Sequence, residues 1–310
     1  MKYIISENTE ITLNEESVVA IGNFDGVHIA HQRLIKEAID FATRSRMQSV
    51  VLTFRPHTAH LFDRFGSPHL IMSYEEKIEE IGRLGVDIII EQRFDEIFAN
   101  LSREEFLSGY MRQLQTRAIF IGFDFKFGRD GTSNTEHLLE FGRKTGVFIY
   151  VLKPQSLLGT TISSTKIRNL LLEGNIELAN QFLGRRYYIS GSVIPGKMLG
   201  RSLGFPTANI PIVNRLSPRE GVYLTNTIIE GMRYKSVSNV GRTSHNKEIT
   251  LLETHILDFD GELYDKRVRV EFIKFLRPEI RFSSMEELVS TIKKDINTAR
   301  MIFGEMSESN

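Results

Sequence analysis

The first half of the chain alternates short apolar runs with longer stretches of helical periodicity. Apolar runs predict strands at residues 17–21, 49–54, 86–90, 118–121 and 147–152. Between them, helical spacing predicts helices over 34–42, 74–84, 103–114 and 135–144, and two short helices follow at 164–172 and 176–183. Continuous apolar runs are typical of strands that are buried on both faces of a parallel sheet. The pattern therefore predicts an α/β domain with a doubly wound parallel sheet.

After residue 184 the pattern changes to short segments that glycine, proline and asparagine separate. Strand-length runs lie at 187–194, 222–229 and 250–257, and the apolar residues of 268–272 alternate strictly. Such a succession predicts a small antiparallel β-barrel or sandwich, which a C-terminal helix with an apolar stripe follows. We expect one domain over 1–184 and a second over 185–310.

Charge and composition narrow the class of protein. Lys and Arg total 39 and Asp and Glu total 39, so the net charge is zero and a globally basic, nucleic-acid-binding surface is excluded. Without cysteine, the chain forms no disulfide, thiolate metal site or cysteine nucleophile. No signal-peptide core opens the sequence, and no apolar run approaches the roughly 20 residues that span a bilayer. We expect a cytoplasmic protein with neither a membrane nor a nucleic acid as partner.

The first candidate site follows the first predicted strand and opens the first predicted helix. Its residues are Gly22, Asn23, Phe24, Asp25, Gly26, His28 and His31. A helix N-terminus offers free amide donors and positive dipole, so it favours phosphate. Two histidines three residues apart can lie on one face and donate to phosphate oxygens. The alternatives are a tight turn with surface histidines and a metal site, for which no third ligand stands out nearby.

A second cluster of hydroxyl and basic side chains begins a later predicted helix. It comprises Ser163, Ser164, Thr165, Lys166 and Arg168. Hydroxyl groups cap helices, but three of them followed by two cations exceed what a cap needs. Such a cluster favours binding of a triphosphate and neutralisation of the negative charge on a departing pyrophosphate.

Together the two clusters resemble the H-x-G-H and Ser-Ser-Thr-x-Ile-Arg motifs of the nucleotidyltransferase superfamily. Residues 53–57 and 122–128 are similar to segments of the bacterial bifunctional riboflavin kinase/FAD synthetase family. This resemblance implies that the flavin contacts Phe54, Pro56, His57, Asp124, Phe125 and Phe127. From the residues alone, each phenylalanine is as readily a core residue as a wall for an isoalloxazine ring.

A glycine-rich run carries the candidate chemistry of the second half. It contains Gly196, Lys197, Gly200, Thr207 and Asn209. A P-loop is rejected, because methionine replaces the required Ser or Thr and strands surround the run. Glycines let backbone amides approach phosphates, and the Thr and Asn side chains supply hard oxygen ligands for Mg²⁺. The run resembles the Gly-x-Pro-Thr-Ala-Asn signature of riboflavin kinase.

The resemblance extends from about residue 15 to about 303 and implies two ATP-dependent reactions. Glu253 stands at the position of the family's general base, and Arg277 is implied on the flavin side. The barrel would phosphorylate riboflavin to FMN, and the first domain would adenylylate FMN to FAD with release of pyrophosphate. His28, His31 and Arg168 would stabilise the charge of that second reaction. We expect Mg²⁺ as cofactor, ATP, riboflavin and FMN as substrates, and a monomer or weak homo-oligomer.

Several positions depart from the family pattern in both halves. Ala30 replaces a glycine between the histidines, Arg55 and Thr58 flank the Pro-His pair, and Asp265 stands where a glycine is usual. The segment 129–132 and the missing Pro-Thr after Gly241 differ as well. Two alternatives follow: a monofunctional FAD synthetase with a weak or silent kinase domain, and a flavin-binding regulator without turnover.

Overall fold

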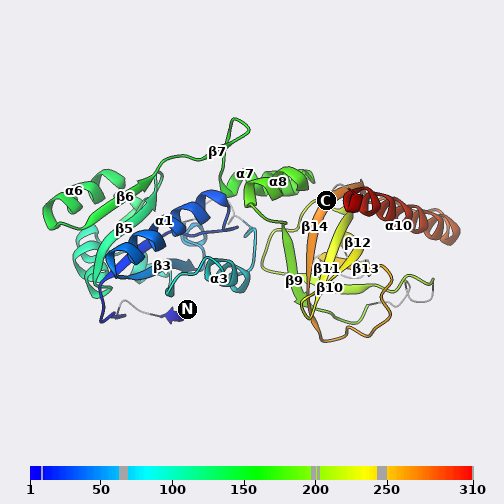
Figure 1. Ribbon diagram of the computed structural model, residues 1–310, viewed down its shortest axis with the longest axis horizontal. Coiled ribbons are helices and arrows are strands. Elements are labelled where there is room, and N and C mark those ends of the chain that lie inside the picture. The colour runs from blue at the N-terminus through cyan, green and yellow to red at the C-terminus, as the bar shows by residue number, and fades with distance from the viewer. Residues whose placement is uncertain (8–9, 63–68, 197–199, 201–202, 243–249, 309–310) are drawn as a thin grey trace. The chain divides into compact units, whose positions relative to one another are not determined.

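The computed structural model of the protein describes residues 1–7, 10–62, 69–196, 200, 203–242 and 250–308. The chain separates into two compact units, residues 1–164 and 165–310 (Figure 1). Helices α7 (Ser164–Glu173) and α8 (Ile176–Leu183), which we expected in the first domain, belong to the second unit except for Ser164, the last residue of unit 1. Helix α8 packs against a strand of the second unit, which explains the grouping. A functional boundary after residue 184 stays a prediction.

Six parallel strands form the sheet of unit 1, in the order β1-β4-β3-β2-β5-β6. From β2 onward the chain runs outward from a central strand, first one way and then the other, as in doubly wound folds. This confirms the predicted sheet, although the exposed edge strand β1 was not predicted. The strands are β1 (Lys2–Ser6), β2 (Ser17–Ile21), β3 (Gln48–Arg55), β4 (Ile88–Arg93), β5 (Thr116–Gly122) and β6 (Phe148–Leu152).

Helices cover the sheet of unit 1. Helix α1 (Ile29–Ser45) packs on β2, β3 and β5, and α3 (Tyr74–Gly82) packs on β4. An aromatic core contains alternate strand residues together with Phe98, Phe106 and Tyr110. The predicted helical segment over 103–114 is confirmed, and within it η1 (Glu105–Tyr110) is a π-helical turn before α5 (Met111–Gln113). The remaining elements are α2 (Ala59–Phe62), α4 (Glu96–Ala99), η2 (Arg129–Gly131), α6 (Thr135–Thr145), β7 (Ser156–Leu157) and β8 (Thr160–Thr161).

An antiparallel sheet of unit 2, in the order β10-β13-β12-β11-β14-β9, nearly closes into a barrel. A bridge between Ile194 and Asn209 joins the two edges of the sheet. The barrel is the predicted one, although β10 and β12 were not predicted as strands. Its strands are β9 (Tyr188–Ser192), β10 (Ala208–Ile212), β11 (Gly221–Ile229), β12 (Met232–Arg242), β13 (Thr250–Ile256) and β14 (Arg267–Pro278).

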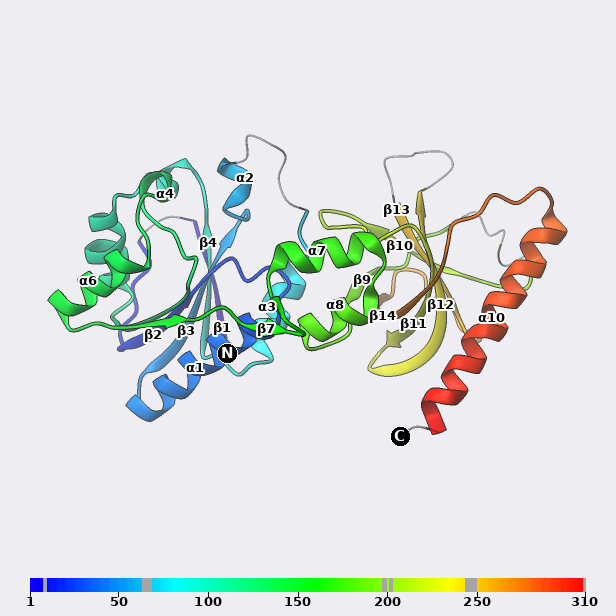
Figure 2. The same ribbon diagram turned by 90° about the horizontal axis from the view of Figure 1, so that it is seen from above.

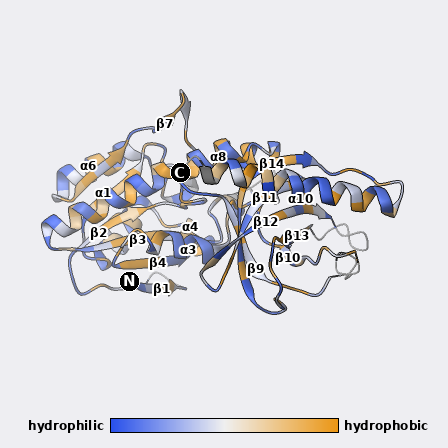
Figure 3. Cartoon of the chain, turned by 45° about the vertical axis from the view of Figure 1, so that its right-hand side comes forward, coloured by the Kyte–Doolittle hydropathy of each residue, from blue (hydrophilic) through white to orange (hydrophobic). Residues whose placement is uncertain are grey.

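The C-terminal helix α10 (Met285–Glu308) lies along the outside of the barrel (Figure 2). Hydrophobic and hydrophilic residues alternate along it (Figure 3), and Ala299 and Phe303 pack with Val222 and Leu224 of β11. The helix thereby covers one face of the strands, as its predicted apolar stripe requires. Within the parts of the chain that the structure describes, no helix is both long and apolar enough to cross a membrane.

Hydroxyl groups fill part of the barrel interior. Because Val222 and Leu224 lie under α10, alternation directs Thr225 to the opposite, inner face of β11. Its Oγ1 lies 2.8 Å from Ser236 Oγ and 2.7 Å from Ser238 Oγ, and Ser238 Oγ lies 2.8 Å from Thr254 Oγ1. These four side chains are fully buried. Each hydroxyl has a partner, so the polar interior avoids the cost of unpaired buried groups.

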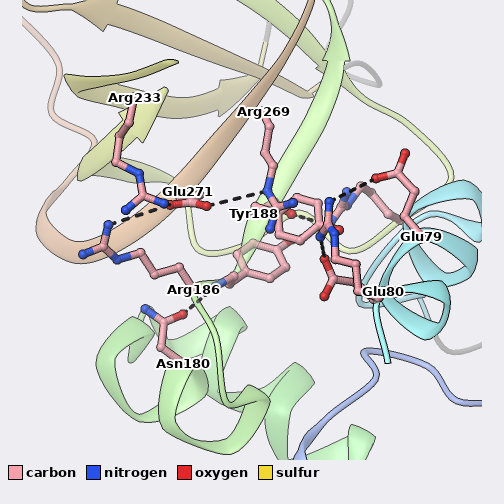
Figure 4. A network of polar contacts seen from close by, with 11 residues as sticks. Glu79, Glu80, Asn180, Arg186, Tyr188, Arg233, Arg269 and Glu271 are labelled. Carbon is pink, nitrogen blue, oxygen red and sulfur yellow. Dashed lines mark hydrogen bonds and ion pairs between the residues drawn. The ribbon is translucent and has the colours of Figure 1, made fainter. Parts of the chain in front are cut away.

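A buried carboxylate of β14 contacts cations of β12, of β14 itself and of the segment that precedes β9 (Figure 4). Glu271 is 7% exposed and lies 3.1 Å from Arg233 and 3.7 Å from both Arg186 and Arg269. The Arg269 guanidinium also lies 3.5 Å from the ring centroid of Tyr188. Three cations compensate one buried anion, which satisfies the requirement that a buried charge be paired.

The barrel core provides a test of the fold. Phe272 is fully buried between Tyr187 and Tyr223, with ring centroids 5.3 and 5.0 Å away. We expect Phe272→Ala to lower the free energy of unfolding by about 3–5 kcal/mol, because it leaves a cavity. Urea unfolding followed by circular dichroism measures this change. Met232→Ala, at a side chain 59% exposed, is the control and should change stability by less than about 0.5 kcal/mol; equal losses would contradict the packing.

Candidate active sites

Three sequence-predicted segments of unit 1 leave the sheet at one edge. They follow β2, β3 and β5, which are adjacent in the sheet, and parallel strands place their carboxyl ends together. The strand order reverses at β2, and ligands of doubly wound folds bind at such a switch point. The topology thus brings the histidine loop (22–28) beside the loops 55–58 and 122–127.

The two histidines lie against each other at the start of α1. His28 is the N-cap, and its Nδ1 accepts a hydrogen bond from the His31 backbone N–H at 3.3 Å. The rings stack with centroids 3.5 Å apart, and Phe24 contacts His31 edge-on at 5.3 Å. An imidazole that accepts at Nδ1 carries its proton on Nε2, so His28 can donate to a phosphate through Nε2.

The turn before the histidines has an unusual backbone. Phe24, Gly26 and Val27 have φ of 52°, 80° and 40°, and the Phe and Val side chains are buried. Residues with side chains rarely occupy this left-handed region, and each costs about 1–3 kcal/mol. A Cβ at Gly26 would also lie 2.9 Å from Ile71 Cδ1, so the terminal methyl of that side chain would have to shift. Such strain persists only where surrounding contacts hold the turn.

Those contacts involve two residues predicted to bind phosphate. The Asp25 carboxylate is 3% exposed, and its Oδ1 and Oδ2 accept from the Ile71 N–H at 3.0 and 3.2 Å. Ser164 Oγ donates to the Asp25 carbonyl oxygen at 2.9 Å. Both side chains therefore have a structural role in the turn. Their contact with phosphate stays a prediction.

Asn23 ties the histidine loop to the segment that follows β3. Its Nδ2 donates to Thr58 Oγ1 at 2.8 Å, and its Oδ1 accepts from the Thr58 N–H at 3.2 Å. Thr53 Oγ1 donates to the Asn23 carbonyl oxygen at 3.1 Å. Gly22 packs against the Phe24 ring, 3.1 Å from where a Cβ would lie. Hydrogen bonds thus connect the predicted phosphate-binding loop directly to the predicted flavin-side segment.

The predicted flavin-side aromatics have different environments. Phe54 is 5% exposed and packs on Phe94 and Phe98 at 5.5 and 5.8 Å, so its ring lies in the core. Phe127 is equally buried, with half-buried Phe125 stacked 5.8 Å away. Of the predicted side chains, Pro56 and Asp124 are exposed and His57 is half-buried.

Phe123 was not selected from the sequence, although it is the most accessible aromatic of this loop. Its side chain is 48% exposed, directly after the carboxyl end of β5. Sequence spacing alone does not separate Phe123 from Phe125 and Phe127. The end of β5 separates them, because Phe123 is the first residue after the strand and is exposed to solvent.

The hydroxyl and basic cluster lies at the start of α7. The helix begins at Ser164, directly after Ser163, so Thr165, Lys166 and Arg168 occupy its first turns. Ser164 and Arg168 are four residues apart and share one face of the helix. The buried face of α7 is made by Ile167, Leu170 and Leu171.

A cavity of about 620 Å³ in unit 2 collects the predicted residues of the second half. This volume is in the range of small-molecule sites. Its lining includes Gly196, Gly200, Thr207, Asn209, Glu253 and Arg277. Lys197 lies outside the described residues.

Strand register explains why residues far apart in sequence line this cavity together. Glu253 of β13 is paired with Asn209 of β10 on one side and with Asn239 of β12 on the other. Paired residues on neighbouring strands point to the same face. Asn239 was not predicted; its Nδ2 lies 3.5 Å from Glu279 Oε1. The register therefore places the exposed Glu253 carboxylate in a row between the amide side chains of Asn209 and Asn239.

The loop before β10 is held closely against the barrel. A Cβ on Gly196 would overlap the Asn209 amide, and one on Gly200 would lie 2.5 Å from the Phe205 carbonyl oxygen. His255 Nδ1 lies 2.9 Å from the Pro206 carbonyl oxygen. The glycines are therefore required by space, and the loop presents Thr207 in a set position.

Arg277 has a partner that the sequence did not indicate. Its Nε and Nη2 donate to the Asp295 carboxylate of α10 at 3.0 and 2.7 Å. Both side chains are largely buried, so this bidentate pair fastens α10 to β14 beside the cavity. Contact between Arg277 and a flavin stays a prediction.

The donor set of the cavity fits Mg²⁺. Thr207 and Asn209 offer a hydroxyl and an amide oxygen, and the Asn209 Nδ2 donates to the Thr207 carbonyl oxygen at 3.4 Å. Magnesium is usually held by one or two protein oxygens together with substrate phosphates and water. No group of three His, Asp or Glu side chains suited to a metal occurs among the described residues. A metal that arrives with the nucleotide matches this arrangement.

Comparison with known proteins assigns a family to each unit. The FAD synthetase family matches residues 10–166, and the riboflavin kinase family matches residues 183–303. Bifunctional riboflavin kinase/FMN adenylyltransferases of Bacillus subtilis and Listeria monocytogenes are 35% and 34% identical over 94% of each chain. The crystal structure of a macrolide-efflux protein from Streptococcus pneumoniae is 29% identical, with a TM-score of 0.87 over 97% of this chain and 99% of that one.

The Asp25 contact provides a test of the histidine loop. We expect Asp25→Ala to lower the free energy of unfolding by about 1–3 kcal/mol, because the fully buried Ile71 N–H loses its acceptor. Amide hydrogen exchange at Ile71 should accelerate correspondingly. Asp124→Ala removes an exposed carboxylate from the neighbouring loop and serves as the control. Unchanged exchange at Ile71 would contradict a structural role for Asp25.

Proposed function

The chain belongs to the bifunctional riboflavin kinase/FMN adenylyltransferase family, and we propose how its two units divide the two reactions of FAD biosynthesis. Unit 2 phosphorylates riboflavin to FMN, and unit 1 transfers AMP from a second ATP to FMN. The observation that carries the proposal is the cavity of unit 2, where Thr207, Asn209 and Glu253 meet on adjacent elements.

Glu253 is the general base of the kinase reaction. It accepts the proton of the ribityl 5′-hydroxyl while that oxygen attacks the γ-phosphorus of ATP and ADP leaves. An exposed carboxylate on a strand suits this role, because it can be reached by a substrate and its position is set by the sheet. The glycines at 196 and 200 let backbone amides approach the phosphates.

Thr207 and Asn209 are the residues that would hold Mg²⁺ against the phosphates of ATP. The bound ion neutralises charge on the transferring phosphoryl group. The two side chains would fix the position of this ion, because His255 holds the loop before Thr207 and strand pairing with β13 holds Asn209.

Unit 1 needs no protein nucleophile. An FMN phosphate oxygen attacks the α-phosphorus of ATP, and pyrophosphate leaves. His28 and His31 stabilise the developing charge at the helix N-terminus, and the sequence motif assigns Ser164 and Arg168 to the same charge. The loops after β3 and β5 supply the flavin side, where we include Phe123 with the predicted residues. We also propose a cytoplasmic enzyme without a nucleic-acid partner.

Two departures from the family pattern are compatible with activity. Ala30 lies in the first turn of α1, where alanine favours the helix. Asp265 has φ of 63°, the left-handed region that favours the usual glycine, and aspartate tolerates it better than most residues. A silent kinase is the second candidate, since Asp265 lies next to Tyr264 of the cavity lining.

Substitution of the base separates the reactions. We expect Glu253→Gln to reduce FMN formation from riboflavin by about 10²–10⁴-fold, because it removes the proton acceptor. FAD formation from added FMN should stay within about twofold. Chromatography of flavins after incubation with Mg-ATP measures both. Glu262→Gln changes another carboxylate of the same cavity and is the matched control; a wild type without FMN formation would favour the silent kinase.

The reciprocal test uses the histidine pair. We expect His31→Ala to lower kcat for FAD formation by about 10²–10³-fold, through loss of one donor to the transition state. FMN formation in unit 2 should be retained, which a pyrophosphate-release assay alongside an ADP assay would show. His137→Ala, at the half-buried third residue of α6, should leave both rates unchanged. Equal loss of the two activities in His31→Ala would refute the assignment.

A further inference from the structure

One buried charge of unit 1 has no part in the chemistry above. Lys77 lies in the first turns of α3, and its side chain is only 4% exposed. Lysine is almost never buried without partners. A cation near a helix N-terminus also opposes the helix dipole, so the position does not serve the stability of α3 itself.

The partners of Lys77 belong to the flavin-side segment. Its Nζ donates to Thr53 Oγ1 at 2.9 Å and to the Phe54 carbonyl oxygen at 3.1 Å. Thr53 Oγ1 in turn donates to the Asn23 carbonyl oxygen. The ammonium therefore begins a row of hydrogen bonds that ends in the histidine loop.

The same turn of α3 holds the other end of this segment. Tyr74 OH accepts from the His57 N–H at 2.9 Å, and the Arg55 guanidinium lies 4.7 Å from the Tyr74 ring centroid. Tyr74 and Lys77 are three residues apart, on one face of the helix. Segment 53–57 is thus held at both ends by one helical turn.

We propose that Lys77 is a positioning residue for the flavin substrate of unit 1, holding segment 53–57 in the arrangement that receives FMN. The inference rests on the proposed adenylyl transfer. It explains why a charged donor is retained at a buried site, since hydrogen bonds from an ionised group are about twice as strong as neutral ones.

Charged and titratable groups surround the ammonium on every side. Glu91 of β4 is 1% exposed and lies 3.5 Å from Arg55 of β3, Asp25 comes from the histidine loop, and Tyr3 of β1 faces Glu91. Burial lowers the pKa of Lys77 to about 8, against the opposing effect of Glu91 and Asp25. Above that pH the side chain becomes a neutral, weaker donor.

The test is made on the full chain with Lys77→Met, which keeps the length of the side chain and removes the donor. We expect KM for FMN to rise about tenfold or more, because a charged hydrogen bond is lost. KM for ATP should stay within about threefold, and riboflavin phosphorylation in unit 2 should be unchanged. A KM for FMN that stays at the wild-type value overturns the proposal, as does an equal rise for both substrates.

The pH dependence distinguishes positioning from a purely structural role. In the wild type, kcat/KM for FMN should fall as pH rises through about 8. Lys77→Arg should lack this midpoint, because guanidinium stays charged. The free energy of unfolding should instead rise with pH from 8 toward the ordinary lysine pKa, since the unfolded chain then binds more protons. If kcat/KM for FMN falls while the free energy of unfolding rises over the same pH range, unfolding is excluded as the cause of the lost activity. If kcat/KM of Lys77→Arg falls with the same midpoint as the wild type, the inference is contradicted.

Tyr74→Phe keeps the proposal testable if Lys77→Met does not fold. It removes only the oxygen that holds the His57 N–H, and KM for FMN should rise about threefold to tenfold. An unchanged KM in this variant counts against positioning by α3. A wild type that forms no FAD from FMN overturns the proposed function and this inference together, whereas an active wild type with indifferent variants overturns the inference alone.

Discussion

Pairing between neighbouring strands decides where the predicted site residues of both units lie. In unit 1, parallel pairing of β2 with β3 and β5 brings three loops to one sheet edge. In unit 2, antiparallel register sets Asn209, Glu253 and Asn239 in one row. A shift of one residue would turn each side chain to the opposite face. The sites therefore depend on backbone hydrogen bonds first and on side-chain contacts second.

Buried polar contacts then give the loops their shape. Asp25 holds the Ile71 N–H, Asn23 holds Thr58, and Lys77 holds Thr53 and the Phe54 carbonyl. Each contact is internal to unit 1, so the loop arrangement exists before a substrate arrives. Loss of one partner leaves the other buried and unsatisfied, which makes these contacts costly to remove. Strained backbone at Phe24 and Val27 is maintained in the same way.

The sequence was sufficient where a pattern reports directly on local structure. Apolar periodicity predicted the central strands and α1. The family resemblance selected Thr207 and Glu253, and both line one cavity in the structure. It was insufficient where tertiary contacts decide. The first residues of β10 belong to the run that begins with Gly196 and Gly200, which predicts a loop, and edge strand β1 has too little burial to show a pattern. Phe54 and Phe123 have the same side chain, and only their position relative to the sheet edge separates core from exposed surface. Lys77 and Asp295 appear as solvated helix residues until their partners are known.

Both reactions transfer phosphorus groups, and the proposed mechanisms use no protein nucleophile, which accounts for the character of the predicted sites. Catalysis then consists of positioning and charge stabilisation, and both require side chains that are held before the substrates bind. Arg277 paired with Asp295 and His28 bonded to the His31 N–H are such side chains. Residues that a motif marks as ligand-binding thus also have structural partners, because preorganisation comes from those partners. Neither reaction requires a thiol, because the flavin is substrate and product rather than a redox cofactor, so the absence of cysteine is compatible with both.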